Sequence, residues 1–236
     1  MIRLLNADFT RLRKNKLFWL LSIFSIGLAL FMIYTQYSDM KKYGEVIETE
    51  QLMINYSTIV GIVIAIFTSL FLGVEYSDGA IRNKISIGHK RTNIYLSNLV
   101  ITTITSLFSY LLFLVIVSSI GIPLFGGITM SISKLLKLLG CIFVTIIAYV
   151  SIFTFLAMII SNKTITAIVT IMLAFGMMFY SLMAFDRLSQ PEYIDTMIMK
   201  DGVQEIINTK NNHYLEGEKR KLIQLSIDIV PAGQMF

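Results

Sequence analysis

Five apolar runs, each about as long as a membrane-spanning helix, dominate the sequence. A helix needs about 20 mostly apolar residues to cross the hydrocarbon core of a bilayer. The runs cover residues 17–35, 56–74, 94–120, 135–160 and 165–185. Only 15% of the 236 residues are charged, whereas a soluble domain carries about a quarter. The sequence therefore predicts an all-α polytopic bundle between residues 17 and 185.

Ionisable side chains do not occur in the middle of any of these runs. Ion-coupled transporters, proton pumps and intramembrane hydrolases generally place such groups at membrane depth. The sequence contains no G-x-x-x-x-G-K-[ST] phosphate loop, and neither His89 nor His213 has a second ligand at metal-site spacing. We therefore expect no catalytic residue, no metal site and no cofactor, and the chain is not expected to be an enzyme.

The positions of the basic residues predict how the bundle is oriented. Cytosolic loops of membrane proteins carry an excess of Lys and Arg. Ten of these residues lie before the first run, between 75 and 93, or at Lys163, and four lie in the segments on the other side. We therefore expect a cytosolic amino terminus. Because the charges gather at the ends of runs, the formal charge of +5 does not indicate a nucleic-acid partner.

Residues 1–16 have the pattern of an amphipathic helix at the membrane surface. Apolar side chains recur at helical spacing, at Ile2, Leu5, Phe9 and Leu12. Five basic residues lie in the same stretch. Such a helix lies with its apolar side in the membrane and its basic side chains on anionic lipid. The alternative is a simple cytosolic tail that follows the positive-inside rule.

Small residues recur at every fourth position along the second run. They are Ser57, Gly61, Ala65, Ser69, Gly73 and Ser77. Residues at this spacing share one helical face, and small side chains there let a neighbouring helix backbone come close. The stripe predicts a helix-packing face. Small residues are also frequent in spans generally, and the pattern does not identify the partner helix.

A short basic interval separates the second and third runs and is expected on the cytosolic side. Ser77 or Asp78 is suited to begin a short helix there, and Gly88 is suited to end it. Ile81 and Ile85 share one face of that helix. The residues alone leave two interpretations open: a segment that docks on a soluble partner, or a solvated loop whose basic residues only fix the topology.

Residues 186–236 are polar and are expected to form an external segment. Apolar residues there suggest short amphipathic helices: Ile194, Met197 and Ile198, then Val203, Ile206 and Ile207. Leu225, Ile227 and Ile229 alternate with polar residues, which is more typical of a strand. No sixth apolar run follows Pro231-Ala232-Gly233-Gln234.

Four features of the chain are found together in one class of membrane protein. They are the basic amphipathic amino terminus, Phe71-Leu72-Gly73-Val74-Glu75-Tyr76 at the end of the second run, Gly79-Ala80-Ile81-Arg82-Asn83-Lys84 followed by Gly88, Arg91 and Ile94-Tyr95, and Pro231-Ala232-Gly233-Gln234. Together they resemble the permease subunit of a type-2 ABC exporter. The small size and the absence of a fused nucleotide-binding domain are most similar to the bacterial bacitracin or lantibiotic self-protection permeases.

The resemblance implies six spans, so the final span is missing and we expect a truncated sequence. It also implies a cytosolic ATP-binding subunit on a separate chain, and a second copy of the permease or a homologous permease. The substrate it implies is hydrophobic or peptidic, a peptide antibiotic included, and is moved outward across a bacterial cell membrane.

The resemblance assigns the basic interval to a coupling segment that docks on the ATP-binding subunit. The residues expected to carry this role are Glu75, Gly79, Ile81, Arg82, Lys84, Ile85 and Gly88. Ile81 and Ile85 are expected to seat in the partner. Arg82 and Lys84 are expected to meet its acidic rim or lipid phosphates. Glu75 is suited to pair with a nearby Arg or Lys, of which those in the amino-terminal helix are one source.

Two other functions remain open. A membrane scaffold or sensor without transport would use the same interval to bind a different cytosolic partner. A channel or secondary transporter is disfavoured by the lack of charge inside the spans and by spans without proline breaks. An adjacent reading frame that encodes a Walker-motif ATPase would favour the exporter.

Overall fold

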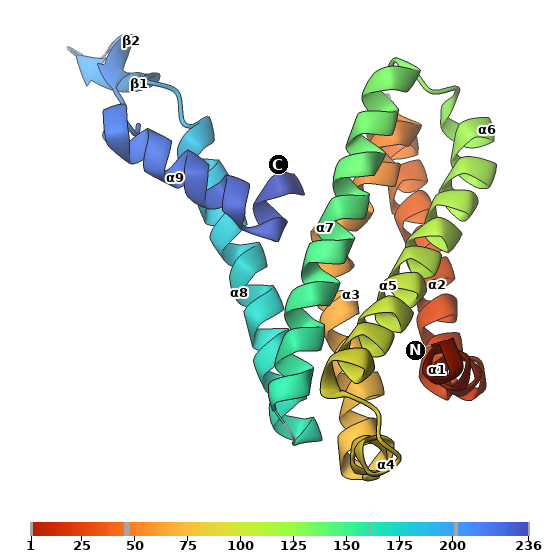
Figure 1. Ribbon diagram of the computed structural model, residues 1–236. Helices are drawn as coiled ribbons and strands as arrows, with labels where there is room; N and C mark the ends of the chain where they lie inside the picture. Colours follow the sequence, from red (N-terminus) through yellow and green to blue (C-terminus); the bar gives the residue numbers. More distant parts are fainter. Residues whose placement is uncertain (1, 45–47, 161, 201–202, 236) are drawn as a thin grey trace. The chain divides into compact units, whose positions relative to one another are not determined.

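The computed structural model describes residues 2–44, 48–160, 162–200 and 203–235 (Figure 1). Five stretches of helix are long and apolar enough to cross a membrane. They are α2 (Lys16–Tyr43), α3 (Thr49–Ser77), Arg91–Phe125, α7 (Ile132–Ile159) and α8 (Lys163–Ser189). The third stretch combines α5 (Arg91–Ile116), the π-helical turn η1 (Val117–Gly121) and α6 (Ile122–Phe125). The predicted polytopic helical membrane bundle is therefore confirmed.

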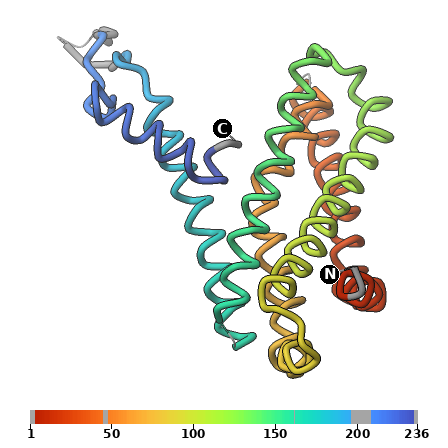
Figure 2. Tube along the Cα trace, viewed as in Figure 1, coloured from red at the N-terminus to blue at the C-terminus, as the bar shows by residue number. Residues whose placement is uncertain are grey.

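The chain forms two compact units, Met1–Phe175 and Gly176–Gln234, so that α8 begins in the first and ends in the second. The Cα trace in Figure 2 follows the first unit from α1 to the start of α8. Each unit is described by itself below.

The spanning helices extend beyond the apolar runs of the sequence. Asn15 caps the start of α2, where its side chain accepts a hydrogen bond from the Leu17 N–H at 2.8 Å. The helix ends only at Gly44, whose φ of +69° suits glycine. Once a helix is nucleated, each further residue adds a backbone hydrogen bond, so polar residues continue it outside the hydrocarbon.

α1 (Ile2–Lys14) packs its apolar face against the bundle. Leu12 is buried in one cluster with Phe71 of α3 and Ile101 of α5. The expectation that this face enters the membrane is therefore wrong for Leu12, whereas Phe9 is half exposed. Helical spacing locates an apolar face, but it does not say whether protein or lipid covers that face.

α3 packs along α7 and also contacts α5 and α2. Five small residues of its stripe are buried: Ser57, Gly61, Ala65, Ser69 and Gly73. The sixth, Ser77 at the end of the helix, is exposed. A β-carbon at Gly61 would come within 2.6 Å of Tyr149 Cζ in α7. A β-carbon at Gly73 would lie 2.8 Å from Lys163 Cγ at the start of α8. The close neighbour at Gly61 is therefore α7, which the sequence pattern does not identify.

Hydroxyl groups connect the helices inside the first unit. Ser109 Oγ of α5 lies 2.6 Å from Ser25 Oγ of α2 and 3.1 Å from the Tyr56 hydroxyl of α3. Thr102 Oγ1 of α5 lies 3.2 Å from Thr154 Oγ1 of α7. Because no water reaches the interior of a membrane bundle, such groups need partners on neighbouring helices. These bonds fix the register between the helices.

The second unit contains a β-hairpin after α8. β1 (Tyr193–Lys200) pairs antiparallel with β2 (Val203–Lys210), with Tyr193 opposite Lys210 and Lys200 opposite Val203. The amphipathic helices predicted from Ile194, Met197 and Ile198 and from Val203, Ile206 and Ile207 are therefore wrong. β-branched residues recur in both segments, and the sequence Asp201-Gly202 between them is a strong hairpin signal.

α9 (Gly217–Ile229) occupies the place of the strand predicted from Leu225, Ile227 and Ile229, so that prediction is also wrong. The helix begins with a run of strong helix formers, Glu218 to Leu222. Ile227 is buried, whereas Leu225 and Ile229 are exposed. η2 (Pro231–Met235) follows α9.

Candidate functional site

A short helix, α4 (Ala80–Ser86), connects the end of α3 to the start of α5. Gly79 is its N-cap residue, with a φ of +69° that non-glycine residues rarely adopt. The prediction that Ser77 or Asp78 caps this helix is wrong. Ser77 Oγ instead bonds back to the Val74 carbonyl at 3.1 Å, and the chain reverses two residues later, at Gly79.

Gly88 terminates α4. Its φ is +94°, its N–H donates to the Ile85 carbonyl at 2.9 Å, and the His89 N–H donates to the Lys84 carbonyl at 3.1 Å. This pair of bonds is the Schellman arrangement, which satisfies the last carbonyls of a helix. Two left-handed glycines therefore define both ends of α4.

Glu75, near the end of α3, is buried beside α4, with 2% of its surface exposed. It forms an ion pair with Arg11 of α1, as the sequence predicts for a basic residue of the amino-terminal helix. Its carboxylate also accepts hydrogen bonds from Lys84 Nζ of α4 at 2.5 Å and from Asn98 Nδ2 of α5 at 2.9 Å. One carboxylate therefore contacts three other helices.

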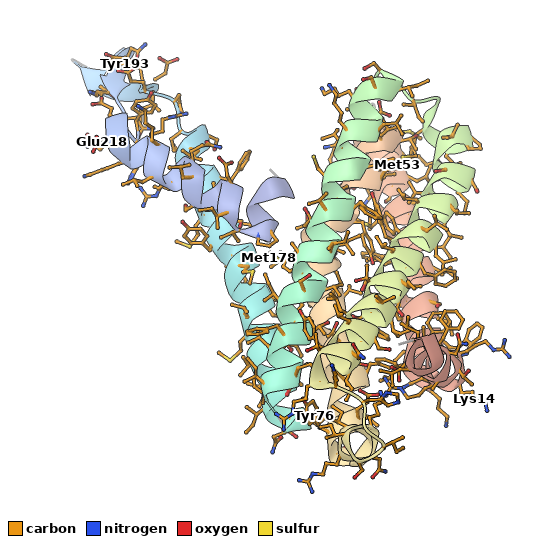
Figure 3. All side chains as sticks on the ribbon, viewed as in Figure 1. Lys14, Met53, Tyr76, Met178, Tyr193 and Glu218 are labelled. Carbon is orange, nitrogen blue, oxygen red and sulfur yellow. The ribbon has the colours of Figure 1, made fainter. Side chains whose placement is uncertain are left out.

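Asp8 of α1 is a second buried carboxylate at the same end of the bundle. It accepts hydrogen bonds from Lys84 Nζ at 2.8 Å and from Ser97 Oγ of α5 at 2.6 Å. We call Asp8, Arg11, Glu75 and Lys84 the charged cluster. Figure 3 shows the side chains that fill this end of the bundle near Tyr76, whereas Lys14 of α1 points away from it.

The charged cluster contains two acids and two bases, so its formal charges cancel. Burial lowers the pKa of Lys84, and the hydrogen bond and negative charge of Asp8 oppose that shift. Burial also lowers the pKa of Arg11, again opposed by Asp8. Arg11 lies 4.2 Å above the Phe71 ring, which adds a cation–π contact. Removing one member of such a cluster leaves a buried charge without its partner.

The residues expected to form the coupling segment divide into two groups. Glu75, Ile81 and Lys84 face the interior of this chain, and Ile81 has only 7% of its surface exposed. The expectation that Ile81 seats in a partner and that Lys84 meets a partner's acids or lipid phosphates is therefore wrong. Their shared helical face is covered by the chain's own α3 and α5.

The outward side of the α4 region carries the other expected residues. Arg82, Ile85 and Gly88 are exposed, and Gly79 is partly exposed. Ile87, which follows the last helical residue, is 78% exposed. Sequence reasoning missed Ile87, which lies between Ser86 and Gly88 and off the face shared by Ile81 and Ile85.

Sequence reasoning also missed Asp8, Ser97 and Asn98. Asp8 could have been noticed in the sequence, because it is the one acidic residue among the first 16. Asn98 could also have been noticed, because it is a polar amide near the start of the third apolar run. Neither signal identifies a partner, because Asp8 and Ser97 lie 89 positions apart in the chain.

A search among curated proteins and a search among solved structures each gave no significant match to the chain. A family model does match, over residues 4–182, and its description is ABC-2 family transporter protein. The matched part contains α1, the charged cluster, α4 and most of α8. The match covers well over half of the chain, which therefore belongs to the ABC-2 transporter family.

Proposed function

We propose that the chain is the membrane-spanning permease subunit of an ABC exporter. Members of its family are transport components that are not themselves catalytic. Among the described residues of this chain, five helices are suited to cross a membrane. Under this proposal a separate cytosolic subunit hydrolyses ATP. A second copy of the permease, or a homologous permease, completes the transporter.

The observation that carries the mechanism is that Lys84 of α4 contacts both Glu75 and Asp8. Breaking a buried ion pair by separating one partner costs about 3–5 kcal/mol. A displacement of α4 that left α3 and α1 in place would break these contacts. We therefore propose that α4, α1 and the end of α3 move together.

The exposed side of the α4 region is the surface we propose for docking the ATP-binding subunit. Ile87 is the most exposed of its apolar side chains, with Ile85 at 38%, and Arg82 adds a positive charge. A small apolar centre with a charged rim is the usual anatomy of a protein interface. In this arrangement the exposed residues bind the partner, and the buried ones carry its displacement to the spans.

The excess of Lys and Arg at this end supports a cytosolic location for α1 and α4 in a bacterial cell membrane. The proposed substrate is hydrophobic or peptidic, and a peptide antibiotic is the first to test because of the resemblance to self-protection permeases. The substrate is then carried outward from the α4 side of the membrane.

Co-expression with a Walker-motif ATP-binding subunit, sought in the adjacent reading frames, tests the proposal. The expected results are co-purification of the two chains and a rise in the antibiotic concentration that cells tolerate, which disappears when the subunit's Walker lysine is replaced. Co-purification without any ATP-dependent effect on tolerance or on export of fluorescent peptide would favour the scaffold or sensor function. No association would contradict both the docking surface and the exporter.

A further inference from the structure

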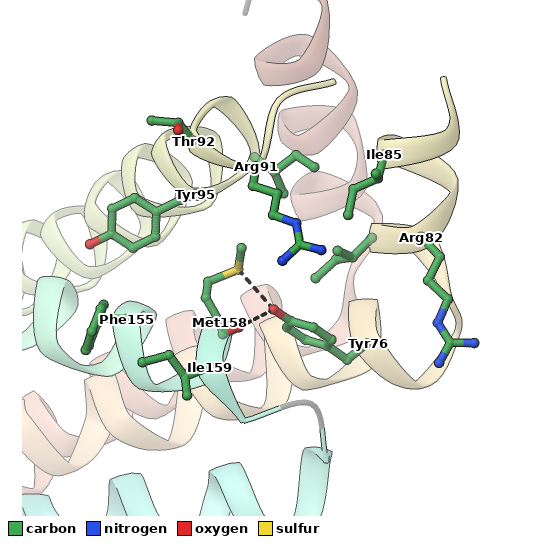
Figure 4. Close-up of a pocket in the computed structure, with 11 residues that line it drawn as sticks. Tyr76, Arg82, Ile85, Arg91, Thr92, Tyr95, Phe155, Met158 and Ile159 are labelled. Carbon is green, nitrogen blue, oxygen red and sulfur yellow. Dashed lines mark hydrogen bonds between the residues drawn. The ribbon is translucent and has the colours of Figure 1, made fainter. Parts of the chain in front are cut away.

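A cavity of about 760 Å³ lies beside α4, on the side away from the charged cluster's hydrogen bonds (Figure 4). The end of α3, α4, the start of α5 and the end of α7 each contribute to its wall. Its volume falls in the range of small-molecule sites, about 300–1,000 Å³. None of the four charged-cluster residues lines this space, whereas Arg82 and Ile85 of the proposed docking surface lie along its edge.

Two arginines and no acidic residue line the cavity, at Arg82 and Arg91. In Figure 4 the Arg91 guanidinium points toward the Tyr76 hydroxyl. That hydroxyl already donates a hydrogen bond to the Met158 carbonyl at 2.5 Å. The Arg91 side chain makes neither an ion pair nor a hydrogen bond with the described residues, and its charge lies near the Tyr76 hydroxyl. A guanidinium offers paired N–H donors that match a phosphate group, so the polar side of the cavity suits an anion.

The backbone adds to this preference at the same place. Arg91 is the first residue of α5, and the N-cap residue Lys90 makes no side-chain capping hydrogen bond. The first N–H groups of a helix have no partner within the helix and favour a negative charge. Thr92, in the same turn, also lines the cavity.

The other side of the cavity is apolar. Phe155 and Ile159 of α7 line it, and they are 55% and 62% exposed. Both belong to the last turns of a membrane-spanning helix, so their exposed surfaces continue into the lipid-facing side of α7. A free phosphate would leave this apolar wall uncovered, whereas an acyl chain would cover it.

We propose that the cavity binds one anionic phospholipid from the membrane leaflet at this end of the bundle. The headgroup phosphate lies on Arg91, the Thr92 hydroxyl and the first turn of α5, with Arg82 at the rim. The first part of one acyl chain runs along Phe155 and Ile159. The lipid then contacts α4, α5 and α7 together.

Native mass spectrometry of the full chain, released from detergent, measures this binding. The two probes are phosphatidylglycerol and phosphatidylcholine with identical acyl chains. Phosphatidylglycerol should bind more tightly. The R91Q variant should lose about fivefold in affinity for it, as expected for one basic side chain at an anionic lipid. K134Q removes one exposed basic side chain at the start of α7 and should leave both affinities unchanged. Equal binding of the two lipids, or an unchanged affinity in R91Q, would overturn the proposal.

Two further measurements separate the lipid from other occupants. Soluble glycerol phosphate should not displace phosphatidylglycerol, and displacement at equal concentration would overturn the role of the apolar wall. A photo-crosslinking residue at position 92, in nanodiscs that contain phosphatidylglycerol, should add the mass of one lipid. A crosslink to a protein chain in its place would assign the cavity to a docked partner and overturn the proposal.

Discussion

The ammonium group of Lys84 lies 2.5 Å from the carboxylate of Glu75, although the two residues belong to different helices. The same ammonium group lies 2.8 Å from Asp8, on a third helix. A lysine on the segment proposed to receive force from a partner is thus bound to two acids of the membrane domain. This relationship makes α4 part of the bundle and gives the coupling proposal its physical basis.

Replacing Lys84 by Ala should destabilise the protein strongly. Glu75 keeps Arg11, but Asp8 loses its cationic partner while buried, and removing one partner of a buried pair costs about 3–5 kcal/mol. The measurement is thermal unfolding in detergent. Lys90→Ala is the matched control, because Lys90 is exposed and its side chain caps nothing. Equal melting temperatures for the two variants would contradict a structural role for the cluster.

Asp8→Asn should separate docking from force transmission. The amide keeps the size of the carboxylate and can accept from Ser97, but it removes the charge that faces Lys84. We expect normal association with the ATP-binding subunit and reduced export per ATP hydrolysed. The two quantities are measured on the same reconstituted sample. Full export by the variant would show that the charge of Asp8 is dispensable for coupling.

Gly79→Ala should weaken the turn between α3 and α4. Nothing lies within 4 Å of a β-carbon there, so the cost comes from the φ of +69° and amounts to about 1–2 kcal/mol. Gly140→Ala is the control, because Gly140 lies within α7 with open space around it and alanine favours a helix by about 1 kcal/mol. Melting temperatures should move in opposite directions, and a parallel shift would contradict the assigned turn.

Gly61→Ala should test the close approach of α3 and α7. The added methyl group would lie 2.6 Å from Tyr149 Cζ, and overpacking of this kind costs about 1–3 kcal/mol. Gly27→Ala, in α2 with open space around it, should cost nothing. Combining Gly61→Ala with Tyr149→Ala should make the glycine substitution harmless. Additive losses in the double variant would argue against this contact.

The spans, the left-handed Gly88 and the pairing of Glu75 with a basic residue of α1 follow from local chemistry and could be predicted. Apolar length specifies a membrane helix, a glycine after a short amphipathic stretch ends it, and a buried acid needs a cation. The first two depend on residues close together in the chain, whereas the third follows from the need of a buried acid for a cation and names no single partner, since Arg11 lies 64 positions from Glu75.

The orientation of α4 could not be predicted in the same way. Spacing shows that Ile81 and Ile85 share a face, but it does not show that α3 and α5 cover Ile81. The contact between Asp8 and Ser97 could not be predicted either, because it depends on how α1 packs against α5. The hairpin at 193–210 was missed for a different reason, because apolar residues in short segments fit periods of both 2 and 3.6.

Association of the ATP-binding subunit with the Ile87→Asp variant tests the central claim most directly. Ile87 is 78% exposed on the α4 side, and Ile132, 74% exposed at the start of α7, supplies a matched control at the other end of the bundle. Both variants should melt like the unmodified protein. Ile87→Asp should lose the subunit on co-purification while Ile132→Asp retains it. Equal retention by the two variants would contradict docking at α4.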